Sequence, residues 1–339
     1  MKQIYIHIGL HKTGSTYIQK VCADNRAYLQ SCGLEYPELG AEFLFGHHNI
    51  AWSLMPGHAL KNTDSFSFSQ LLDQIDQCAA KRFLISSEDF DFLQPDQIDK
   101  LRHLLAEYDV KVVMYVRNPM TALYSYWQES IKHGDTRSFK AYCEQILIDP
   151  QPVDYCKIAS KWTKTFGDEA LSIIVYDNLV AAKADIALYL LREALGIAVE
   201  TDQLVIPDRK VNPSSDVGVV EVIRQLNEIQ KKSDCSKSMT GAFMTFLNQS
   251  PTGQKLKQYL QSEHEDSDDF VDLAALEKPF SQLAEKFLLI HKEQIRNLGE
   301  GEALFANRKI DDRSVVRIAN AEALAKKVDM AKLHSLLVS

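Results

Sequence analysis

The first 33 residues of the chain change their hydrophobic period at a glycine-containing loop. Residues 4–9 read Ile-Tyr-Ile-His-Ile-Gly, an alternation that predicts a strand. From Ser15 onward, apolar side chains recur at helical spacing and the pattern closes at Gly33; they are Tyr17, Ile18, Val21, Cys22, Tyr28, Leu29 and Cys32. A glycine-bearing loop between a strand and its helix aims backbone N–H groups at an anion, and the helix dipole favours negative charge there. The opening of the chain therefore predicts a strand–loop–helix unit that binds an anionic group.

Strand and helix patterns alternate as far as about residue 200. Further strands are expected at 82–86, 110–116 and 171–176, and helices near 67–80, from Pro95, from Pro119, and near 154–166 and 183–195. The rest of 34–80 reads as irregular loop. This order predicts an α/β fold, a P-loop-type parallel β-sheet flanked by helices.

Helical periodicity replaces the strand pattern beyond about residue 215, for example at Val220, Ile223 and Leu226. We therefore expect an α/β core at 1–215 and an all-helical C-terminal extension at 216–339, packed on that core. Two roles stay open for the extension: shaping a substrate cleft, or self-association into a homo-oligomer.

Composition limits the classes of partner. The formal net charge of the 339 residues is −8, so an anionic ligand must be held by a local cluster of donors, and nucleic acid is not an expected partner. The N-terminus lacks the apolar segment of a signal peptide, and no run of about 18 apolar residues predicts a membrane span. We expect a cytoplasmic protein. Six scattered cysteines without a CxxC pair predict reduced thiols.

The loop after the first strand differs from that of a kinase. It reads Gly9-Leu10-His11-Lys12-Thr13-Gly14-Ser15-Thr16. A nucleoside-triphosphate loop carries its lysine directly after the second glycine, whereas Lys12 comes two positions before Gly14. No convincing strand ending in aspartate is present to hold Mg²⁺. The sequence therefore predicts a phosphate site that uses Lys12 and the hydroxyls of Ser15 and Thr16 without a metal.

The order Lys12-Thr13-Gly14-Ser15-Thr16 after a first strand resembles the 5′-phosphosulfate loop of sulfotransferases that use 3′-phosphoadenosine 5′-phosphosulfate (PAPS). With His11 included it is especially similar to bacterial sulfotransferase-family proteins. The family pairs this loop with an arginine at the end of a later strand and a serine eight residues on, both of which bind the 3′-phosphate. Here Arg117 ends the strand at 112–116, and Ser125 follows at that spacing.

The position of Arg117 also makes sense without the family. Ligands of α/β proteins bind at the carboxyl ends of the strands, and a guanidinium matches the geometry of a phosphate. The resemblance covers roughly residues 1–215.

Two weaker similarities follow along the chain. Tyr176 lies in a segment where the family places a tyrosine near the adenine, although a core tyrosine at a strand end is an equal alternative. Arg209 and Lys210 lie where sulfotransferases often carry a loop that closes over the nucleotide. A plain basic turn is the alternative.

The resemblance implies in-line transfer of the sulfuryl group, catalysed by positioning and by charge stabilisation. Lys12 would neutralise the leaving phosphate oxygen, while Thr13, Gly14, Ser15 and Thr16 hold the 5′-phosphate. Glu88 follows the strand at 82–86 and resembles the glutamate base of glycan-modifying sulfotransferases.

His47 or His48, expected in a loop, are alternative bases, and His11 could stabilise the transferred group. The paired histidines have no Cys, Asp or Glu nearby at ligand spacing, so no metal is expected.

The expected acceptor is a hydroxyl or amine of a small metabolite, a carbohydrate or another glycan. Two other functions stay open: a P-loop nucleotide kinase-like enzyme, and a catalytically silent nucleotide-binding protein on the same fold.

Overall fold

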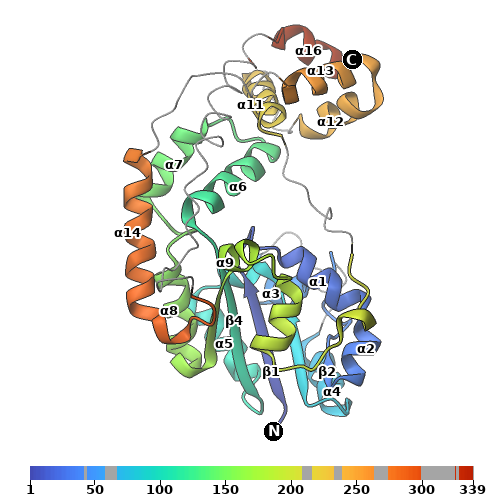
Figure 1. Cartoon of the computed structure of the whole chain (residues 1–339), viewed down its shortest axis with the longest axis vertical. Coiled ribbons are helices and arrows are strands. Elements are labelled where there is room, and N and C mark those ends of the chain that lie inside the picture. Colours follow the sequence, from blue (N-terminus) through green and yellow to red (C-terminus); the bar gives the residue numbers. More distant parts are fainter. Residues whose placement is uncertain are drawn as a thin grey trace. The chain divides into compact units, whose positions relative to one another are not determined.

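The computed structural model describes residues 1–41, 44–57, 67–207, 216–232, 239–262, 274–298, 325 and 328–338 (Figure 1). They form two compact units. The first comprises Met1–Asn118, Asp154–Asn212 and Leu283–Ala306, and the second Pro119–Val153, Pro213–Gln282 and Asn307–Ser339. The boundary expected after residue 215 lies near one passage between the units. Because the chain passes between them several times, however, no single boundary separates them.

A five-stranded parallel sheet forms the centre of the first unit, in the order β2-β3-β1-β4-β5. The strands are β1 Gln3–Gly9, β2 Leu34–Glu35, β3 Arg82–Ser86, β4 Asp109–Val116 and β5 Leu171–Val175. Four of them confirm the predicted strands. The edge strand β2 was not predicted, because two residues are too short to show an alternation.

Helices cover the sheet as the alternation predicted. Those of the first unit are α1 Ser15–Asp24, α2 Arg26–Ser31, α3 His48–Leu54, α4 Phe68–Gln77, α5 Pro95–Leu104, α8 Tyr155–Phe166, α9 Tyr176–Ala181 and α10 Ile186–Tyr189. Side chains of α1, α2 and α10 pack into one apolar cluster with Tyr5, Val113 and Ile174 of the sheet. Helix α8 contacts β4 and β5 and packs on α5 (Figure 1). The sheet thus lies among helices in an α/β architecture.

The single helix predicted between Ser15 and Cys32 is two helices. Asn25 separates α1 from α2, and its side chain is buried. The Asn25 amide donates to the carbonyls of Val21 and Val205, and its carbonyl accepts from the Val205 N–H, all at 2.8 Å. A side chain that satisfies backbone groups of another segment favours a break in the helix.

The carboxyl ends of the strands position the loops of interest. Strands β1, β3, β4 and β5 end at Gly9, Ser86, Val116 and Val175, so the segments after them start from one edge of the sheet. Strand β1 has β3 on one side and β4 on the other. The strand order therefore reverses at β1, and α/β proteins bind ligands at such a point.

The described residues of the second unit form helices and their connections. They are α6 Pro119–Lys132, α7 Phe139–Ile148, α11 Val217–Lys232, α12 Thr240–Gln249, α13 Pro251–Ser262 and α16 Met330–Val338, with the first part of α14 Ala274–His291. Trp127 packs on Phe139, and the buried Asn227 amide donates to the carbonyl of Ile131 at 2.7 Å. None of the helices in the described ranges is both long and apolar enough to cross a bilayer.

A short segment after α14 joins the sheet, which the helical pattern did not predict. Ile295 forms a parallel bridge with Ile173 of β5. The side chain of Asn297 then accepts from the N–H of Val175 at 2.7 Å and donates to its carbonyl at 2.9 Å. An asparagine amide carries one acceptor and a donor group, so it can replace a neighbouring strand at this edge.

Candidate active site

The loop after β1 is held in a left-handed conformation at three positions. Gly9, Lys12 and Gly14 have φ of 74°, 66° and 84°. The hydroxyl of Thr13 donates to the carbonyl of Leu10 at 2.6 Å and closes the loop on itself. Gly14 is the N-cap residue of α1, and no side chain caps this helix end. The positive end of the α1 dipole therefore faces the loop, an arrangement that suits an anion.

Arg117 joins this loop to the ends of two other strands. Its Nη1 donates to the carbonyl of Lys12 at 3.0 Å, and its guanidinium lies 5.4 Å from the ring centre of Tyr176. The hydroxyl of Tyr155 donates to the carbonyl of Arg117 at 2.6 Å. Lys12, Arg117 and Tyr176, each singled out in the sequence, are thus brought together at the carboxyl edge of the sheet.

The sequence also singled out Ser125, Arg209 and Lys210. Ser125 lies on α6 in the second unit, where its hydroxyl donates to the carbonyl of Thr121 at 3.1 Å. Its pairing with Arg117 stays a prediction from spacing. Arg209 and Lys210 lie outside the described residues.

Glu88 lies directly beside the loop. It begins the 3₁₀ helix Glu88–Phe92 after β3. A Cβ atom at Gly9 would lie 2.8 Å from the Cα and Cβ of Glu88, so only glycine allows this approach. The side-chain amide of the buried Gln19 donates to Glu88 Oε2 at 2.8 Å. Gln19 had no signal in the sequence, because a single polar residue on a helix does not reveal which element it faces.

His47 is a structural residue in this arrangement. The N–H of Ser86 donates to its Nδ1 at 3.1 Å, and its Nε2 donates to the carbonyl of Pro37 at 3.0 Å. Burial lowers the pKa of His47 to about 3. Both ring nitrogens are engaged with the backbone, and we assign no catalytic role to His47.

His48 begins α3, where the sequence analysis expected a loop. Its Nδ1 lies 2.9 Å from Oδ2 of Asp89 and its Nε2 lies 4.0 Å from Oε2 of Glu88. His11 Nε2 lies 3.7 Å from the other carboxylate oxygen of Asp89. Asp89 was missed in the sequence, although its place next to Glu88 offered a weak signal.

The ionisable side chains near the loop differ in the direction in which the fold shifts their pKa. Burial raises the pKa of Asp89, but the hydrogen bond and charge of His48 and the charge of His11 outweigh it, so its pKa lies below the usual range. The pKa of His11 is lowered as well. Burial lowers it, and the charges of Glu88 and Asp89, which act to raise it, offset only part of this effect. The buried Asp91 has a pKa well above its usual range, because of burial and the nearby charge of Asp89. The segment therefore holds carboxyl groups of contrasting acidity.

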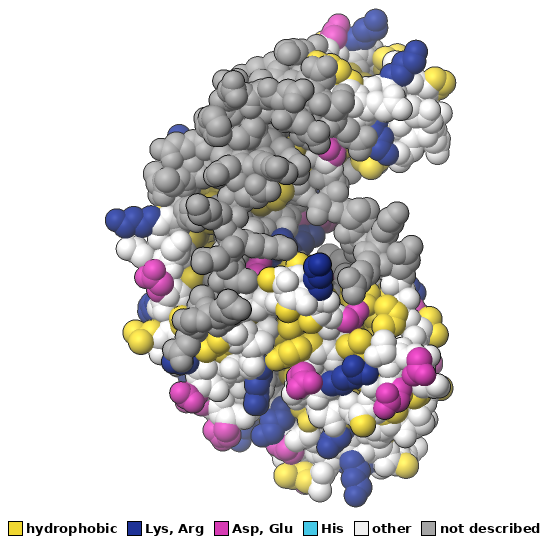
Figure 2. All heavy atoms as spheres, in the orientation of Figure 1, with side chains coloured by type: hydrophobic (Ala, Val, Ile, Leu, Met, Phe, Trp, Pro, Cys, Tyr) yellow, Lys and Arg dark blue, Asp and Glu magenta, His cyan; other side chains and the backbone are white. Residues whose placement is uncertain are grey.

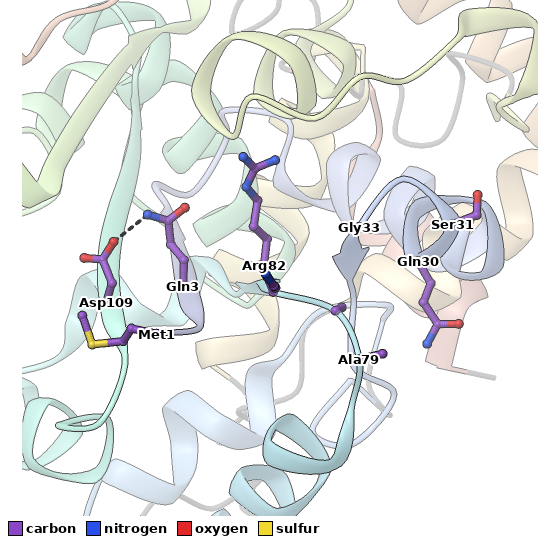
Figure 3. A pocket seen from close by; sticks show the side chains of 10 residues that line it. Met1, Gln3, Gln30, Ser31, Gly33, Ala79, Arg82 and Asp109 are labelled. Atoms are coloured by element: carbon purple, nitrogen blue, oxygen red, sulfur yellow. Dashed lines mark hydrogen bonds between the residues drawn. The ribbon is translucent and has the colours of Figure 1, made fainter.

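A pocket of the first unit lies at the opposite end of the strands (Figure 3). Gln3, Arg82 and Asp109 line it from the amino ends of β1, β3 and β4. Gln3 donates to Asp109 at 2.6 Å, the bond drawn in Figure 3. This pocket is separate from the loop after β1 and is not part of the candidate site.

On the side of the first unit seen in Figure 2, basic and acidic side chains are interspersed among its described residues.

Comparison with known proteins identifies the relatives of the chain. Residues 5–192, more than half of the chain, match the family described as Sulfotransferase domain. Among solved structures, a sulfotransferase from Alicyclobacillus acidocaldarius is similar at 14% identity and a TM-score of 0.41, over 70% of this chain and 97% of that one. Curated protein sequences gave no match. Because this family matches more than half of the chain, the chain belongs to the sulfotransferase domain family.

Proposed function

We propose that this protein transfers the sulfuryl group of PAPS to a hydroxyl or amine of a small-molecule or glycan acceptor. Membership of the family supports sulfuryl transfer in general. The observation that carries the choice of donor is the hydrogen bond of 3.0 Å between Arg117 and the carbonyl of Lys12. It joins a loop suited to a 5′-phosphate with an arginine suited to a second phosphate, and PAPS carries both groups.

The residues present fit the two ends of such a donor. The N-terminus of α1, with Ser15 and Thr16, would hold the 5′-phosphosulfate. The Thr13 hydroxyl is used within the loop, so Thr13 would contribute only its N–H. Arginine has five N–H donors, and one bond to Lys12 is compatible with a further bond to the 3′-phosphate.

Three contacts to the nucleotide rest on spacing and resemblance. Ser125 would join Arg117 at the 3′-phosphate, Tyr176 would lie near the adenine, and Arg209 and Lys210 would close over the nucleotide.

PAPS, when bound, supplies a sulfuryl group on an activated phosphate oxygen. Lys12 would neutralise the charge that develops on that oxygen as the bond from sulfur to it breaks. Glu88 would accept the proton of the acceptor hydroxyl as the new bond to sulfur forms, a role that contributes roughly 10²–10⁴-fold to the rate of an enzyme. His11, between the loop and Asp89, would stabilise the transferred group. None of these roles needs a metal ion.

The test is cleavage of PAPS by the purified protein in EDTA, with a panel of sugars, phenols and amines as acceptors. Release of adenosine 3′,5′-bisphosphate is measured for wild type, Lys12→Met and Lys100→Met, the last being an exposed lysine on α5. We expect release in wild type and Lys100→Met, and a loss of at least about 100-fold in Lys12→Met. Equal release from all three would overturn the assignment. Cleavage of ATP with Mg²⁺ but not of PAPS would instead support the kinase-like alternative.

A further inference from the structure

Asp89 bridges two histidines that come from different elements. Its Oδ2 lies 2.9 Å from Nδ1 of His48 on α3, and its Oδ1 lies 3.7 Å from Nε2 of His11 on the loop after β1. Its own N–H donates to the hydroxyl oxygen of Ser87 at 3.1 Å, which fixes the start of the 3₁₀ helix. The carboxylate is therefore held between the phosphate loop and the helix that carries His48.

The ring of His48 is held from several sides. It is stacked on Trp52 with ring centres 5.6 Å apart, and Ser87 Oγ lies 3.0 Å from its Nδ1. A Cβ atom at Gly46 would lie 2.6 Å from His48 Nε2, so the backbone of Gly46 packs against the ring edge. The side chain is nearly buried, with 6% of its surface exposed. Rotation of the ring would lose these contacts.

The contact with Asp89 determines which nitrogen of His48 carries the proton. An ionised carboxylate only accepts hydrogen bonds, and the pKa of Asp89 lies below its usual range despite the effect of burial. Nδ1 must then donate to Asp89, which leaves Nε2 as the basic nitrogen of the neutral ring. This is the nitrogen that lies 4.0 Å from Glu88 Oε2.

We propose that Asp89 is a positioning residue that fixes His48 with its basic Nε2 toward Glu88, so that His48 and Glu88 take up the acceptor proton together. The inference rests on the proposed function and deepens it. At 4.0 Å the two atoms are too far apart for a direct hydrogen bond, and an acceptor hydroxyl placed between them would reach both. Gln19, which donates to Glu88 Oε2 at 2.8 Å, holds the other side of the pair.

The transfer breaks two bonds and moves one proton. The acceptor O–H bond breaks and its proton passes to Glu88 Oε2 or His48 Nε2, while the acceptor oxygen forms its bond to sulfur. The bond from sulfur to the phosphate oxygen breaks, and its electron pair stays on that oxygen, next to Lys12. Asp89 stabilises the imidazolium that forms when His48 holds the proton.

The charged groups that face His48 come from two elements. Asp89 and Glu88 lie on the 3₁₀ helix after β3, and His11, adjacent to Lys12, approaches from the loop. Asp89→Asn replaces the carboxylate next to Nδ1 with an amide that can also donate a hydrogen bond. The neutral ring should then no longer keep its proton on Nδ1 alone.

The experiment measures the histidine side chains of the full-length protein by ¹⁵N–¹H correlation spectroscopy across pH 5–9, with His48→Gln for assignment. The variants are Asp89→Asn, Asp89→Glu and the matched control Asp96→Asn, an exposed aspartate on α5. In wild type and Asp96→Asn, neutral His48 should carry its proton on Nδ1. Asp89→Asn should mix the tautomers of neutral His48, and Asp89→Glu should restore part of the preference for the proton on Nδ1. An unchanged tautomer of His48 in Asp89→Asn would overturn the inference.

Two further readouts separate this inference from the proposed function. Titration with adenosine 3′,5′-bisphosphate tests the nucleotide site, and equal binding by wild type and Asp89→Asn shows that the variant is folded. PAPS cleavage by Asp89→Asn should lose about 10- to 100-fold in kcat with its KM for PAPS unchanged, and an unchanged kcat would count against the inference. If no protein binds the bisphosphate, the proposed function fails, while the tautomer of His48 still decides whether Asp89 positions the ring.

Discussion

Gly9 is the residue on which the position of the candidate base depends. It combines a left-handed backbone with a close approach to the Cα and Cβ of Glu88. An added methyl group there would meet backbone, which cannot yield as a flexible side chain can. The glycine that ends β1 therefore has two functions, since it turns the chain into the phosphate loop and leaves room for Glu88.

Gly9→Ala should cost more stability than Gly33→Ala. Both glycines have positive φ, 74° and 86°, but a Cβ at Gly33 meets nothing within 4 Å. Gly33→Ala should lose about 1–2 kcal/mol from the left-handed backbone alone, and Gly9→Ala roughly 1–3 kcal/mol more from the clash. Urea unfolding of the two variants and wild type measures the difference. Equal losses would show that Glu88 does not lie against Gly9.

The candidate site was predictable from sequence where its residues lie at strand ends. Lys12, Arg117 and Tyr176 each follow a strand with a clear apolar pattern, and parallel strands end at one edge of a sheet. Asp89 and Gln19 were not predictable in the same way. Their contacts depend on how a 3₁₀ helix and α1 pack, and neither spacing nor periodicity encodes that packing.

The segment around Asn297 shows how a distant element completes the sheet. Its side chain pairs with both backbone groups of Val175, and its carbonyl accepts from the side-chain amide of Asn178 at 2.7 Å. These contacts flank Tyr176 on both sides. The end of β5, and with it the proposed adenine contact, is thus held by residues more than 100 positions later in the chain.

Asn297→Ala should destabilise the protein by about 1–3 kcal/mol, because the N–H and carbonyl of Val175 lose their partners. It should also weaken binding of adenosine 3′,5′-bisphosphate several-fold through displacement of Tyr176. Thermal unfolding and calorimetry provide the two values. Asn248→Ala, an exposed asparagine on α12, is the matched control and should change neither. A wild-type unfolding temperature for Asn297→Ala would contradict this role.

Two short elements could not be predicted from the sequence, and the physical reason is the same for both. Strand β2 has two residues, and α3 has seven residues within a stretch read as loop. Short elements carry too few positions for a period to be visible, and tertiary contacts decide their conformation. In α3, His48 is held by Asp89, a contact between segments 41 positions apart.

At the scale of the whole molecule, buried neutral histidines make the fold sensitive to acid. Burial lowers the pKa of His7 to about 4 and that of His47 to about 3, from an ordinary value of 6.5. The unfolded chain therefore binds protons at these side chains at a higher pH than the folded protein. Their contribution to stability is complete above pH 6.5 and is lost as the pH falls toward 4.

The free energy of unfolding should fall by about 2 kcal/mol per buried histidine between pH 7 and 5. Urea unfolding at the two pH values measures it. His47→Asn should reduce this loss, while His133→Asn should leave it unchanged, because His133 has 75% of its side chain exposed. A loss that is equal in wild type and His47→Asn would show that folding does not lower the pKa of His47.

The chain forms its two units from interleaved segments, which composition did not reveal. Residues 119–153 belong to the helical unit and 283–306 to the unit with the sheet. A change of periodicity near residue 215 identifies where the strands end, but it cannot show that an earlier helix pair belongs elsewhere. Which unit a helix joins is decided by apolar contacts such as those of Trp127 with Phe139.

The most direct test of PAPS as the donor is calorimetric titration in EDTA with adenosine 3′,5′-bisphosphate and with 5′-AMP. Wild type and Arg117→Ala are compared with Arg102→Ala, whose Nη1 donates to the carbonyl of Thr165 away from the loop. We predict metal-independent binding of the bisphosphate in preference to 5′-AMP, weakened at least about 10-fold in Arg117→Ala and unchanged in Arg102→Ala. Equal affinity of the wild type for both nucleotides, or binding of neither, would contradict PAPS as the donor.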